Sequence, residues 1–244
     1  RVMGVGAGGW AEYAVSDYRR TLPVPDHMDL IQGGTISSAF LTMHDAIVTN
    51  GEFKSGQSIL IQGGSTGVGI MGMQFGEHLG ASLVIGTSTN PERRARLAEF
   101  GADLALDSSD PGWVDQVLEA TDGKGVDLII DQISGYAANQ NMAATKVHGR
   151  IINVGRLGGE VAEFDFNTHA ERRLTYIGTT GRTRSLEEHA EVFRRARADL
   201  WDALDAGKFK MPIDSTFDIS EAPAALERAK ANLHFGRIML TINA

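Results

Sequence analysis

The sequence predicts an α/β protein built on a doubly wound, mostly parallel sheet with helices on both faces. Short apolar, strand-like runs alternate with helical segments between residues 58 and 155, and such alternation is typical of parallel sheets. In addition, the run from Ser58 to Gln62 reads as a buried strand, and it leads into a glycine-rich turn and a helix with no charge before Glu77. We expect the rest of the sheet to assemble around this strand, turn and helix.

The other predicted elements of the sheet follow in order. Strands are expected at 82–86, 103–107, 126–131 and 149–155. Helices are expected between them at 91–100, 111–121 and 136–145. Pro91 suits the first turn of its helix, because its missing N–H would have no helical partner there. Each strand is thus followed by a helix, as a doubly wound sheet requires.

The segments before this block follow other patterns. Trp10, Tyr13 and Val15 alternate as in a strand that would pair with further strands, and residues 29–50 read as a well-buried helical region. We expect residues 1–28 to belong to a second domain and 29–184 to form the sheet domain.

After the block, residues 158–167 read as a loop and 173–181 as one more strand. A long amphipathic helix is predicted at 186–206, with Ser185 as N-cap and Glu188 three residues later. The chain then closes with a strand at 212–218, a helix at 220–231 and a strand at 236–243. We assign residues 185–244 to the same second domain as the N-terminal segment.

Composition excludes several classes of function. The net charge of −8 leaves no basic face for nucleic acid or an anionic membrane. No run of 18 apolar residues and no signal peptide is found, so we expect a cytoplasmic protein acting on a small-molecule substrate. The absence of cysteine excludes disulfides and cysteine-ligated zinc, and the seven histidines include no i, i+4 pair. We therefore predict no metal site within this chain.

The glycine-rich turn matches a dinucleotide-binding fingerprint in two frames. Gly64, Thr66 and Gly69 fill the three glycine positions in one frame, with Thr66 at the middle position; Gly67, Gly69 and Gly72 fill them in the other. We favour the first, because the turn must follow the strand directly for backbone N–H groups to face a pyrophosphate. Gly72 would then allow close helix packing. A glycine-rich turn without a ligand is the alternative. The predicted cofactor contacts here are Gly64, Ser65, Thr66, Gly67 and Val68.

Several separate stretches carry a family resemblance. They are AGGWAEYAV, AFLTMHDAI, ILIQGGSTGVG, VDLIID, GRIINVG and FDISEAPAALERAKANLHFGRIMLTI. Together they resemble the medium-chain dehydrogenase/reductase superfamily, and within it the zinc-independent quinone oxidoreductase branch. The resemblance implies a Rossmann domain inserted into a GroES-like β-barrel catalytic domain, which is incomplete in these 244 residues. It also implies a homodimer that pairs through the strand near residues 174–180.

The resemblance also implies site residues. Thr42 matches a threonine beside the nicotinamide, although its hydroxyl could instead bond back to its own helical turn. Sister branches bind zinc with one ligand near the position of Ser38, which cannot serve that role. We assign no catalytic residue. Further cofactor contacts are implied for Val154, Gly155, Arg156, Leu157, Thr179 and Asn232, where Arg156 could equally be a solvated loop charge.

The predicted cofactor is NADP(H). An acid about 20 residues beyond the glycines would bind the adenosine ribose of NAD, and no acid occurs between Ala81 and Pro91. Ser88 and Thr89 can donate hydroxyls there, and Arg93 matches the family's basic residue for the 2′-phosphate. The alternative is that the arginines of this helix are only solvated charges.

These observations lead to one expected function and two alternatives. We expect an NADPH-dependent, zinc-independent reductase of quinones or α,β-unsaturated carbonyls that works by hydride transfer. An alcohol or aldehyde dehydrogenase of the same superfamily is one alternative. The other is a dinucleotide-binding module without catalysis, and a polypeptide of only these 244 residues is expected to bind cofactor with little turnover.

Overall fold

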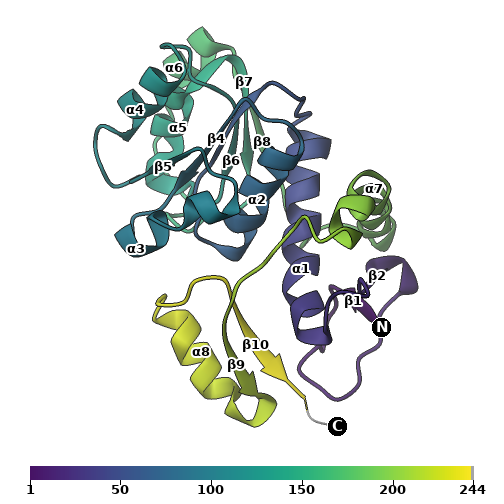
Figure 1. Cartoon of the computed structure of the whole chain (residues 1–244). Coiled ribbons are helices and arrows are strands. Elements are labelled where there is room, and N and C mark those ends of the chain that lie inside the picture. The colour runs from purple at the N-terminus through teal and green to yellow at the C-terminus, as the bar shows by residue number, and fades with distance from the viewer. Residues whose placement is uncertain (243–244) are drawn as a thin grey trace. The chain divides into compact units, whose positions relative to one another are not determined.

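The computed structural model describes residues 1–242, and the chain divides into two compact units (Figure 1). One unit is Met43–Thr180, and the other combines Arg1–Thr42 with the chain from Gly181 onward. In the described part of the chain, no helix is both long and apolar enough to cross a membrane. The last position of the predicted strand at 236–243 lies outside the described residues.

The sheet unit contains six strands that are all parallel. They are β3 (Ser58–Ile61), β4 (Leu83–Thr87), β5 (Leu104–Leu106), β6 (Val126–Asp131), β7 (Thr145–Asn153) and β8 (Thr175–Gly178). Their order across the sheet is β5-β4-β3-β6-β7-β8. The chain therefore moves outward from β3 to β5 and returns on the other side of β3. This reversal confirms the predicted doubly wound sheet and puts β8 at an edge.

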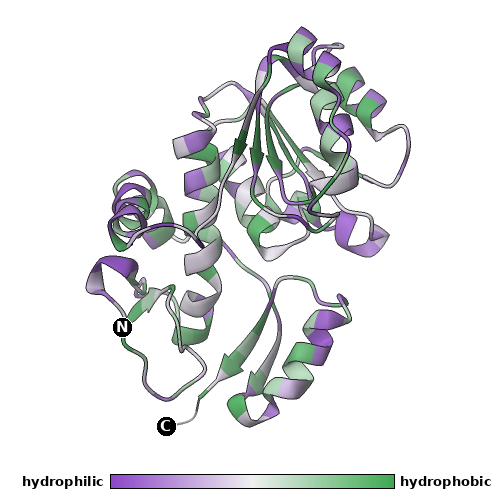
Figure 2. Cartoon of the chain, turned by 180° about the vertical axis from the view of Figure 1, so that it is seen from behind, coloured by the Kyte–Doolittle hydropathy of each residue, from purple (hydrophilic) through white to green (hydrophobic). Residues whose placement is uncertain are grey.

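Alternate side chains of the strands pack on opposite faces of the sheet. Leu60 and Ile129 join the core cluster that contains Trp113 of α4 (Trp113–Ala120) and Met142 of α5 (Ala138–Ala144). The neighbouring Ile59 faces α2 (Gly67–His78) on the other side. Figure 2 shows these strands coloured hydrophobic along most of their length, as expected for a sheet covered on both faces.

Two glycines let α2 lie close to the sheet. A Cβ at Gly72 would lie 3.2 Å from Cδ1 of Ile61 on β3, and one at Gly76 would lie 2.9 Å from Cγ2 of Ile59. Both distances are tighter than nearly all real Cβ contacts. The predicted packing role of Gly72 is therefore confirmed.

Two helical segments of the sheet unit differ from prediction. The single helix expected at 91–100 is split into α3 (Pro91–Arg94) and a 3-10 turn (Leu97–Phe100). The segment 158–167, expected to be a loop throughout, leads into α6 (Phe166–Arg172). The carboxylate of Asp165 caps this helix by accepting the N–H groups of the next turn. α6 is short and contains few apolar residues, so its sequence shows no helical period. The capping residue Asp165 was the one signal that could have predicted it.

The other unit contains helices and two small sheets. α1 (Leu30–Met43) continues as a π-helical segment (His44–Asn50) in the sheet unit, which confirms the predicted helical region at 29–50. α7 (Leu186–Asp205) begins with the predicted capping box, in which Ser185 and Glu188 each accept the other's backbone N–H.

The C-terminal elements form a separate parallel pair. β9 (Ile213–Asp218) and β10 (Arg237–Thr241) are parallel and are joined by α8 (Ala222–Lys230). They form a two-stranded sheet of their own, so the predicted break from the main sheet is confirmed, although the pair is itself parallel.

The strand predicted around Trp10 is wrong. The only strands before α1 in the described chain are β1 (Val2–Gly4) and β2 (Thr21–Pro23), which pair antiparallel. Trp10, Tyr13 and Val15 are instead 61%, 87% and 98% exposed. Alternation of apolar residues is a local signal, whereas a strand needs a neighbour for its N–H and C=O groups.

Candidate functional site

The turn between β3 and α2 follows the strand directly. Gly63 adopts a left-handed conformation with φ of 72°, and Thr66 caps α2 because its Oγ1 accepts the N–H of Gly69 at 2.9 Å. A Cβ at Gly69 would lie 2.3 Å from the carbonyl oxygen of Gly63. Only glycine therefore fits at position 69, which is a glycine position in both predicted frames.

Some backbone N–H groups of this turn have acceptors and others do not. Acceptors within 3.0 Å exist for the N–H groups of Gly63, Gly64 and Thr66. No acceptor among residues 1–242 pairs with the N–H groups of Ser65, Gly67 and Val68. Unpaired donors at the N-terminus of a 12-residue helix form a site for an anion, since the helix dipole adds to their attraction.

Polar side chains from three strand ends hold the turn in place. The Thr66 hydroxyl donates to Oε1 of Gln132 at 2.7 Å, and Nε2 of Gln132 donates to the carbonyl of Gln62 at 3.0 Å. The side chain of Gln62 accepts from Thr87 at 2.7 Å and donates to Asn141 at 2.8 Å. Gln62, Thr87 and Gln132 lie at the carboxyl ends of β3, β4 and β6, where the strand order reverses. In open α/β sheets, ligands bind at such a reversal.

A buried carboxylate shapes the loop after β6. Asp131 is fully buried, and one of its oxygens accepts the N–H groups of Ile133 at 2.9 Å and Ser134 at 2.8 Å. Burial raises the pKa of Asp131. The hydroxyl of Tyr176 on β8 donates to the other oxygen at 3.3 Å, and burial together with the charge of Asp131 raises the pKa of Tyr176. Asp131 and Tyr176 thus link the loop after β6 to the edge strand.

The loop after β7 packs tightly on the loop after β6. The N–H groups of Val154 and Gly155 donate to the carbonyl of Asp131 at 2.8 and 3.1 Å, and that of Leu157 donates to the carbonyl of Gln132 at 3.1 Å. A Cβ at Gly155 would lie 2.6 Å from that same carbonyl oxygen of Gln132. These three predicted contact residues therefore have their N–H groups engaged, so a ligand would meet their other atoms.

Two further predicted residues lie beside this loop. Thr179 donates both its N–H and its hydroxyl to the carbonyl of Asn153, at 2.9 and 3.1 Å. The Arg156 side chain is exposed, with one long hydrogen bond of 3.4 Å to the carbonyl of Val154. The structure thus brings Thr179 and the loop after β7 together at one edge of the sheet.

The loop after β4 adjoins the glycine turn. The Ser88 hydroxyl donates to the Ser65 hydroxyl at 3.0 Å, and Ser88 is buried whereas Thr89 is exposed. Asn90 caps α3 by accepting the N–H of Arg93 at 2.9 Å. Arg93 is half-buried and lies in the first turn of α3. This turn directly follows the loop whose Ser88 contacts Ser65 of the glycine turn.

The neighbouring arginines have carboxylate partners. Arg94 pairs with Asp107 at 2.9 Å and also donates to the carbonyl of Ser88 at 2.8 Å. Arg96 pairs with Glu99 at 3.0 Å on an exposed face. Arg94 thus braces the loop, and Arg96 takes part in a surface pair.

Two predicted contacts belong to the other unit. Thr42 is the last residue of that unit on α1, and Asn232 follows α8 with a left-handed φ of 51°. Their roles remain predictions. Among residues 1–242, no group of three or more His, Cys, Asp or Glu side chains could hold a metal ion.

Sequence reasoning missed the polar residues that hold the turn. Gln62 directly follows β3, and Gln132 directly follows β6. Asn141 lies in α5, and the predicted helix at 136–145 gave no reason to single it out. Position at the end of a buried strand was the available signal for the two glutamines.

Comparison with known proteins identifies the family. The sequence pattern of the family described as "Zinc-binding dehydrogenase" matches residues 67–197, more than half of the chain. The chain belongs to this family. It thereby belongs to the medium-chain dehydrogenase/reductase superfamily, as its motifs predicted.

Curated relatives of the family include quinone oxidoreductases. The chain is 26% identical over 221 residues to that of Pongo abelii and 25% identical to that of Homo sapiens; each match covers 91% of this chain and 65% of the relative. The chain therefore spans slightly less than two thirds of their length. It is also 25% identical to a stretch of Erythronolide synthase EryA2 of Saccharopolyspora erythraea, covering 99% of this chain and 6% of the synthase.

Solved structures share the fold. The crystal structure of AibC is similar with a TM-score of 0.84 at 23% identity, covering 97% of this chain and 63% of that one. The structure of mycobacterial Rv1454c complexed with NADPH gives a TM-score of 0.80 at 23% identity, covering 91% and 68%. These similarities show the fold of the family.

Proposed function

We propose that this family member binds NADPH and reduces a quinone or an α,β-unsaturated carbonyl compound by hydride transfer. The observation that carries the proposal is the glycine turn at the strand reversal, where the N–H groups of Ser65, Gly67 and Val68 have no acceptor among residues 1–242. These donors suit the pyrophosphate that joins the two halves of a dinucleotide.

The loop after β4 favours NADPH over NADH. It contains no carboxylate for a ribose 2′-hydroxyl, and Ser88 is hydrogen-bonded to the turn that would hold the pyrophosphate. Arg93 begins at the same loop and can supply a charge-assisted hydrogen bond to a 2′-phosphate. The similar mycobacterial structure was solved with NADPH, which supports the same assignment.

The residues of this chain would mainly bind and orient. The glycine turn would hold the pyrophosphate, and Thr179 and the loop from Val154 to Leu157 would position the nicotinamide end. When bound, the cofactor supplies the hydride. We propose that no zinc takes part, because Ser38 replaces the ligand expected near that position from the family resemblance.

Reduction of a quinone or enone is favoured by the relatives. The curated proteins at 25–26% identity over 91% of this chain are quinone oxidoreductases. An alcohol dehydrogenase is the second candidate, because a structure described as an NAD-dependent alcohol dehydrogenase gives a TM-score of 0.82. Comparing turnover of a quinone, an enone and a primary alcohol with either cofactor separates these functions, and binding without any turnover would favour a non-catalytic module.

Substitution of Arg93 tests the cofactor assignment. A charge-assisted hydrogen bond to phosphate contributes about 1.5–3 kcal/mol, so Arg93→Ala should raise the Kd of NADPH by roughly tenfold to a hundredfold. The Kd of NADH should stay unchanged. Arg96→Ala is the matched control, because Arg96 lies three residues further along the chain and pairs with Glu99. Fluorescence titration at fixed low salt measures the Kd of both cofactors for the wild type and for each variant.

Two results would contradict the assignment. Wild-type protein could bind NADH as tightly as NADPH, or Arg93→Ala could weaken both cofactors equally. Either result would mean that the loop after β4 does not recognise a 2′-phosphate.

We also propose that the protein forms a homodimer through β8. This strand is at the edge of the six-stranded sheet and pairs with β7 on one side only within residues 1–242. An edge strand leaves unpaired N–H and C=O groups that a second copy can pair, which would continue the sheet across a two-fold axis.

A further inference from the structure

Ser134 has a backbone conformation that normally requires glycine. It lies in the loop after β6, with φ of 57° and ψ of −147°. A residue with a side chain is strained in this region and stays there only where the surrounding contacts impose it. Strain of this kind is concentrated at functional sites. Ser134 contacts the loop after β7, which contains four of the predicted cofactor contacts.

Three hydrogen bonds hold Ser134 in this conformation. Its N–H donates to the buried carboxylate of Asp131 at 2.8 Å, and its carbonyl accepts the N–H of Ala137 at 2.9 Å. Its hydroxyl donates to the carbonyl of Gly155 at 2.6 Å. Ser134 is itself buried, so water competes little for this hydroxyl. The hydrogen bonds therefore offset the backbone strain and tie Ser134 to the loop after β7.

Asn153 completes the hold on the carbonyl of Gly155. The amide nitrogen of Asn153 donates to the Ser134 hydroxyl, and it also donates to the Gly155 carbonyl at 3.1 Å. A hydroxyl can accept one hydrogen bond while it donates another, and a carbonyl oxygen can accept two. The Gly155 carbonyl is thus fixed by one donor from the end of β7 and one from the loop after β6.

This hold orients the whole peptide group between Gly155 and Arg156. The peptide bonds of the described chain are trans, so the C=O and N–H of one planar group point in opposite directions. The N–H of Arg156 therefore points away from Ser134 and Asn153. Arg156 is exposed, and its N–H has no acceptor in the described part of the chain. Within the loop from 154 to 157, it is the backbone donor that stays available to a ligand.

The same loop is joined to the glycine turn through Gln132. The backbone carbonyl of Gln132 accepts the N–H of Leu157 at 3.1 Å, and its side chain accepts the hydroxyl of Thr66 at 2.7 Å. A dinucleotide with its pyrophosphate at the glycine turn therefore has the loop after β7 within reach of its nicotinamide half.

We propose that Ser134 is a positioning residue that presents the N–H of Arg156 to the nicotinamide end of the cofactor. The carboxamide oxygen of the nicotinamide is the matching acceptor, because a carbonyl oxygen pairs with a backbone N–H. Ser134 acts through the peptide group that it holds and touches no cofactor atom itself. The inference rests on the proposed binding of NADPH.

Replacing Ser134 by glycine tests this role. Ser134→Gly tolerates the same φ and loses the hydroxyl. In the ligand-free 244-residue protein, the NMR signal of the Gly155 carbonyl carbon should move upfield, because one hydrogen bond is lost. The Kd of NADPH, measured by fluorescence titration, should rise roughly threefold to tenfold. Tm should stay within about 4 °C of wild type, because relief of strain offsets the lost hydrogen bond.

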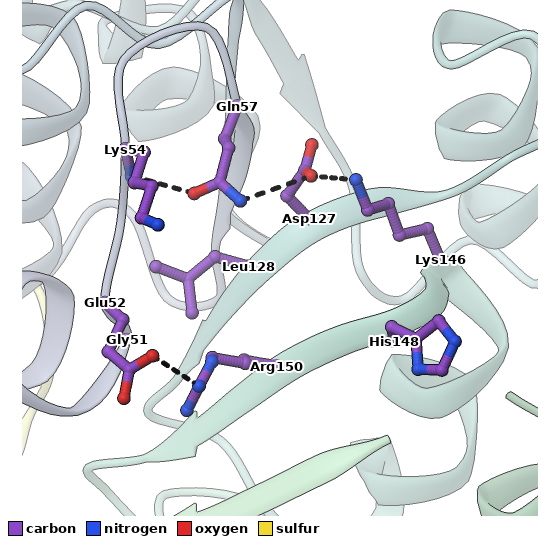
Figure 3. Close-up of a pocket in the computed structure, with 9 residues that line it drawn as sticks. All are labelled: Gly51, Glu52, Lys54, Gln57, Asp127, Leu128, Lys146, His148 and Arg150. Atoms are coloured by element: carbon purple, nitrogen blue, oxygen red, sulfur yellow. Dashed lines mark hydrogen bonds and ion pairs between the residues drawn. The ribbon is translucent and has the colours of Figure 1, made fainter. Parts of the chain in front are cut away.

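His148→Gly is the matched control. His148 also has a left-handed φ, of 65°, and lies in the bulge of β7 between Thr145 and Arg150, where the pairing with β6 shifts register. Figure 3 shows that its imidazole makes no hydrogen bond to the nearby Lys146 or Arg150. Glycine relieves strain at this position too, but no contact with Gly155 is lost. The carbonyl signal of Gly155 and the Kd of NADPH should both stay unchanged.

Hydrogen exchange shows whether the N–H of Arg156 meets the cofactor. In wild-type protein, saturating NADPH should slow exchange of this amide by about tenfold or more. The protection should be weaker in Ser134→Gly at saturation, because the peptide group is no longer held by the hydroxyl. A purely structural role of Ser134 would not change this one amide selectively.

Four results would overturn the inference while wild-type protein still binds NADPH. They are an unchanged Kd in Ser134→Gly, an Arg156 amide that NADPH does not protect, equal weakening in His148→Gly, and a Tm loss in Ser134→Gly well above about 4 °C. Wild-type protein that binds no NADPH would instead refute the proposed function, and the inference with it. The two failures are therefore distinguishable.

Discussion

Replacing Gly69 by alanine should damage both the fold and cofactor binding. The added Cβ would lie 2.3 Å from the carbonyl oxygen of Gly63 and 2.7 Å from Cα of Gly64. Contacts under 3.0 Å are essentially never seen for real Cβ atoms, so helix and turn must separate by at least 0.7 Å, the difference between 3.0 and 2.3 Å. Both neighbours are backbone atoms and cannot rotate away.

The cost of Gly69→Ala follows from two opposing terms. Overpacking of this kind costs about 1–3 kcal/mol or somewhat more, whereas alanine gains up to about 1 kcal/mol over glycine within a helix. We therefore expect a loss of about 1–2 kcal/mol in the free energy of unfolding. A displacement of 0.7 Å also exceeds the normal spread of N–H···O distances, so the N–H groups of Gly67 and Val68 would no longer fit a pyrophosphate. The Kd of NADPH should rise at least about tenfold.

Urea denaturation and NADPH fluorescence titration measure these two effects. The matched control is Gly9→Ala in the other unit, because a Cβ at Gly9 would meet nothing within 4 Å. This control should leave both the stability and the Kd close to wild type. The reasoning is refuted if Gly69→Ala binds NADPH within about threefold of wild type, since the turn would then not depend on this close approach.

Two further predictions address assembly and pH. Ile177→Pro should convert a β8-paired dimer into a monomer in light scattering, because proline has no N–H to donate to a neighbouring strand. The control Ile177→Val should remain dimeric. A wild-type monomer at all concentrations would contradict the pairing. Asp214 hydrogen-bonds to Arg228, which lowers the pKa of Asp214 to about 2 from 3.8. The ion pair of Asp214 therefore stabilises the fold fully above about pH 4, and this stabilisation is lost towards pH 2. Asp214→Asn should lower Tm at pH 7, and the difference in Tm from wild type should shrink between pH 4 and pH 2. A Tm difference that stays constant between pH 5 and pH 3 would refute this.

The sheet could be predicted because its signals are local. Each buried strand, such as β3 or β6, is a short apolar run between turn residues, and the helices between them follow their own period. The strand around Trp10 could not be judged in this way, since its existence depended on a neighbour elsewhere in the chain. α6 was missed for a different reason. Its apolar content is too low for a periodic signal, and the cap at Asp165 is its one sequence signal.

The candidate site was predictable in part for the same reason. The glycine turn and the missing acid after β4 can be read from consecutive residues. The bracing of Thr66 by Gln132 joins positions 66 residues apart, and the bulge of β7 between Thr145 and Arg150 depends on the break in pairing between β6 and β7. Neither feature leaves a pattern along the sequence, because both arise from how the strands are aligned.

The hydrogen bonds around Thr66 have a consequence for how a ligand would bind. Its hydroxyl accepts from Gly69 and donates to Gln132, which donates to Gln62 in turn, so the turn is tied to α2, β6 and β3 without any ligand. A loop that is already ordered loses little conformational entropy on binding, and more of the contact energy is kept as affinity. Binding at this turn should therefore proceed in a single kinetic step whose rate rises linearly with ligand concentration, without the plateau that a slow loop rearrangement would impose.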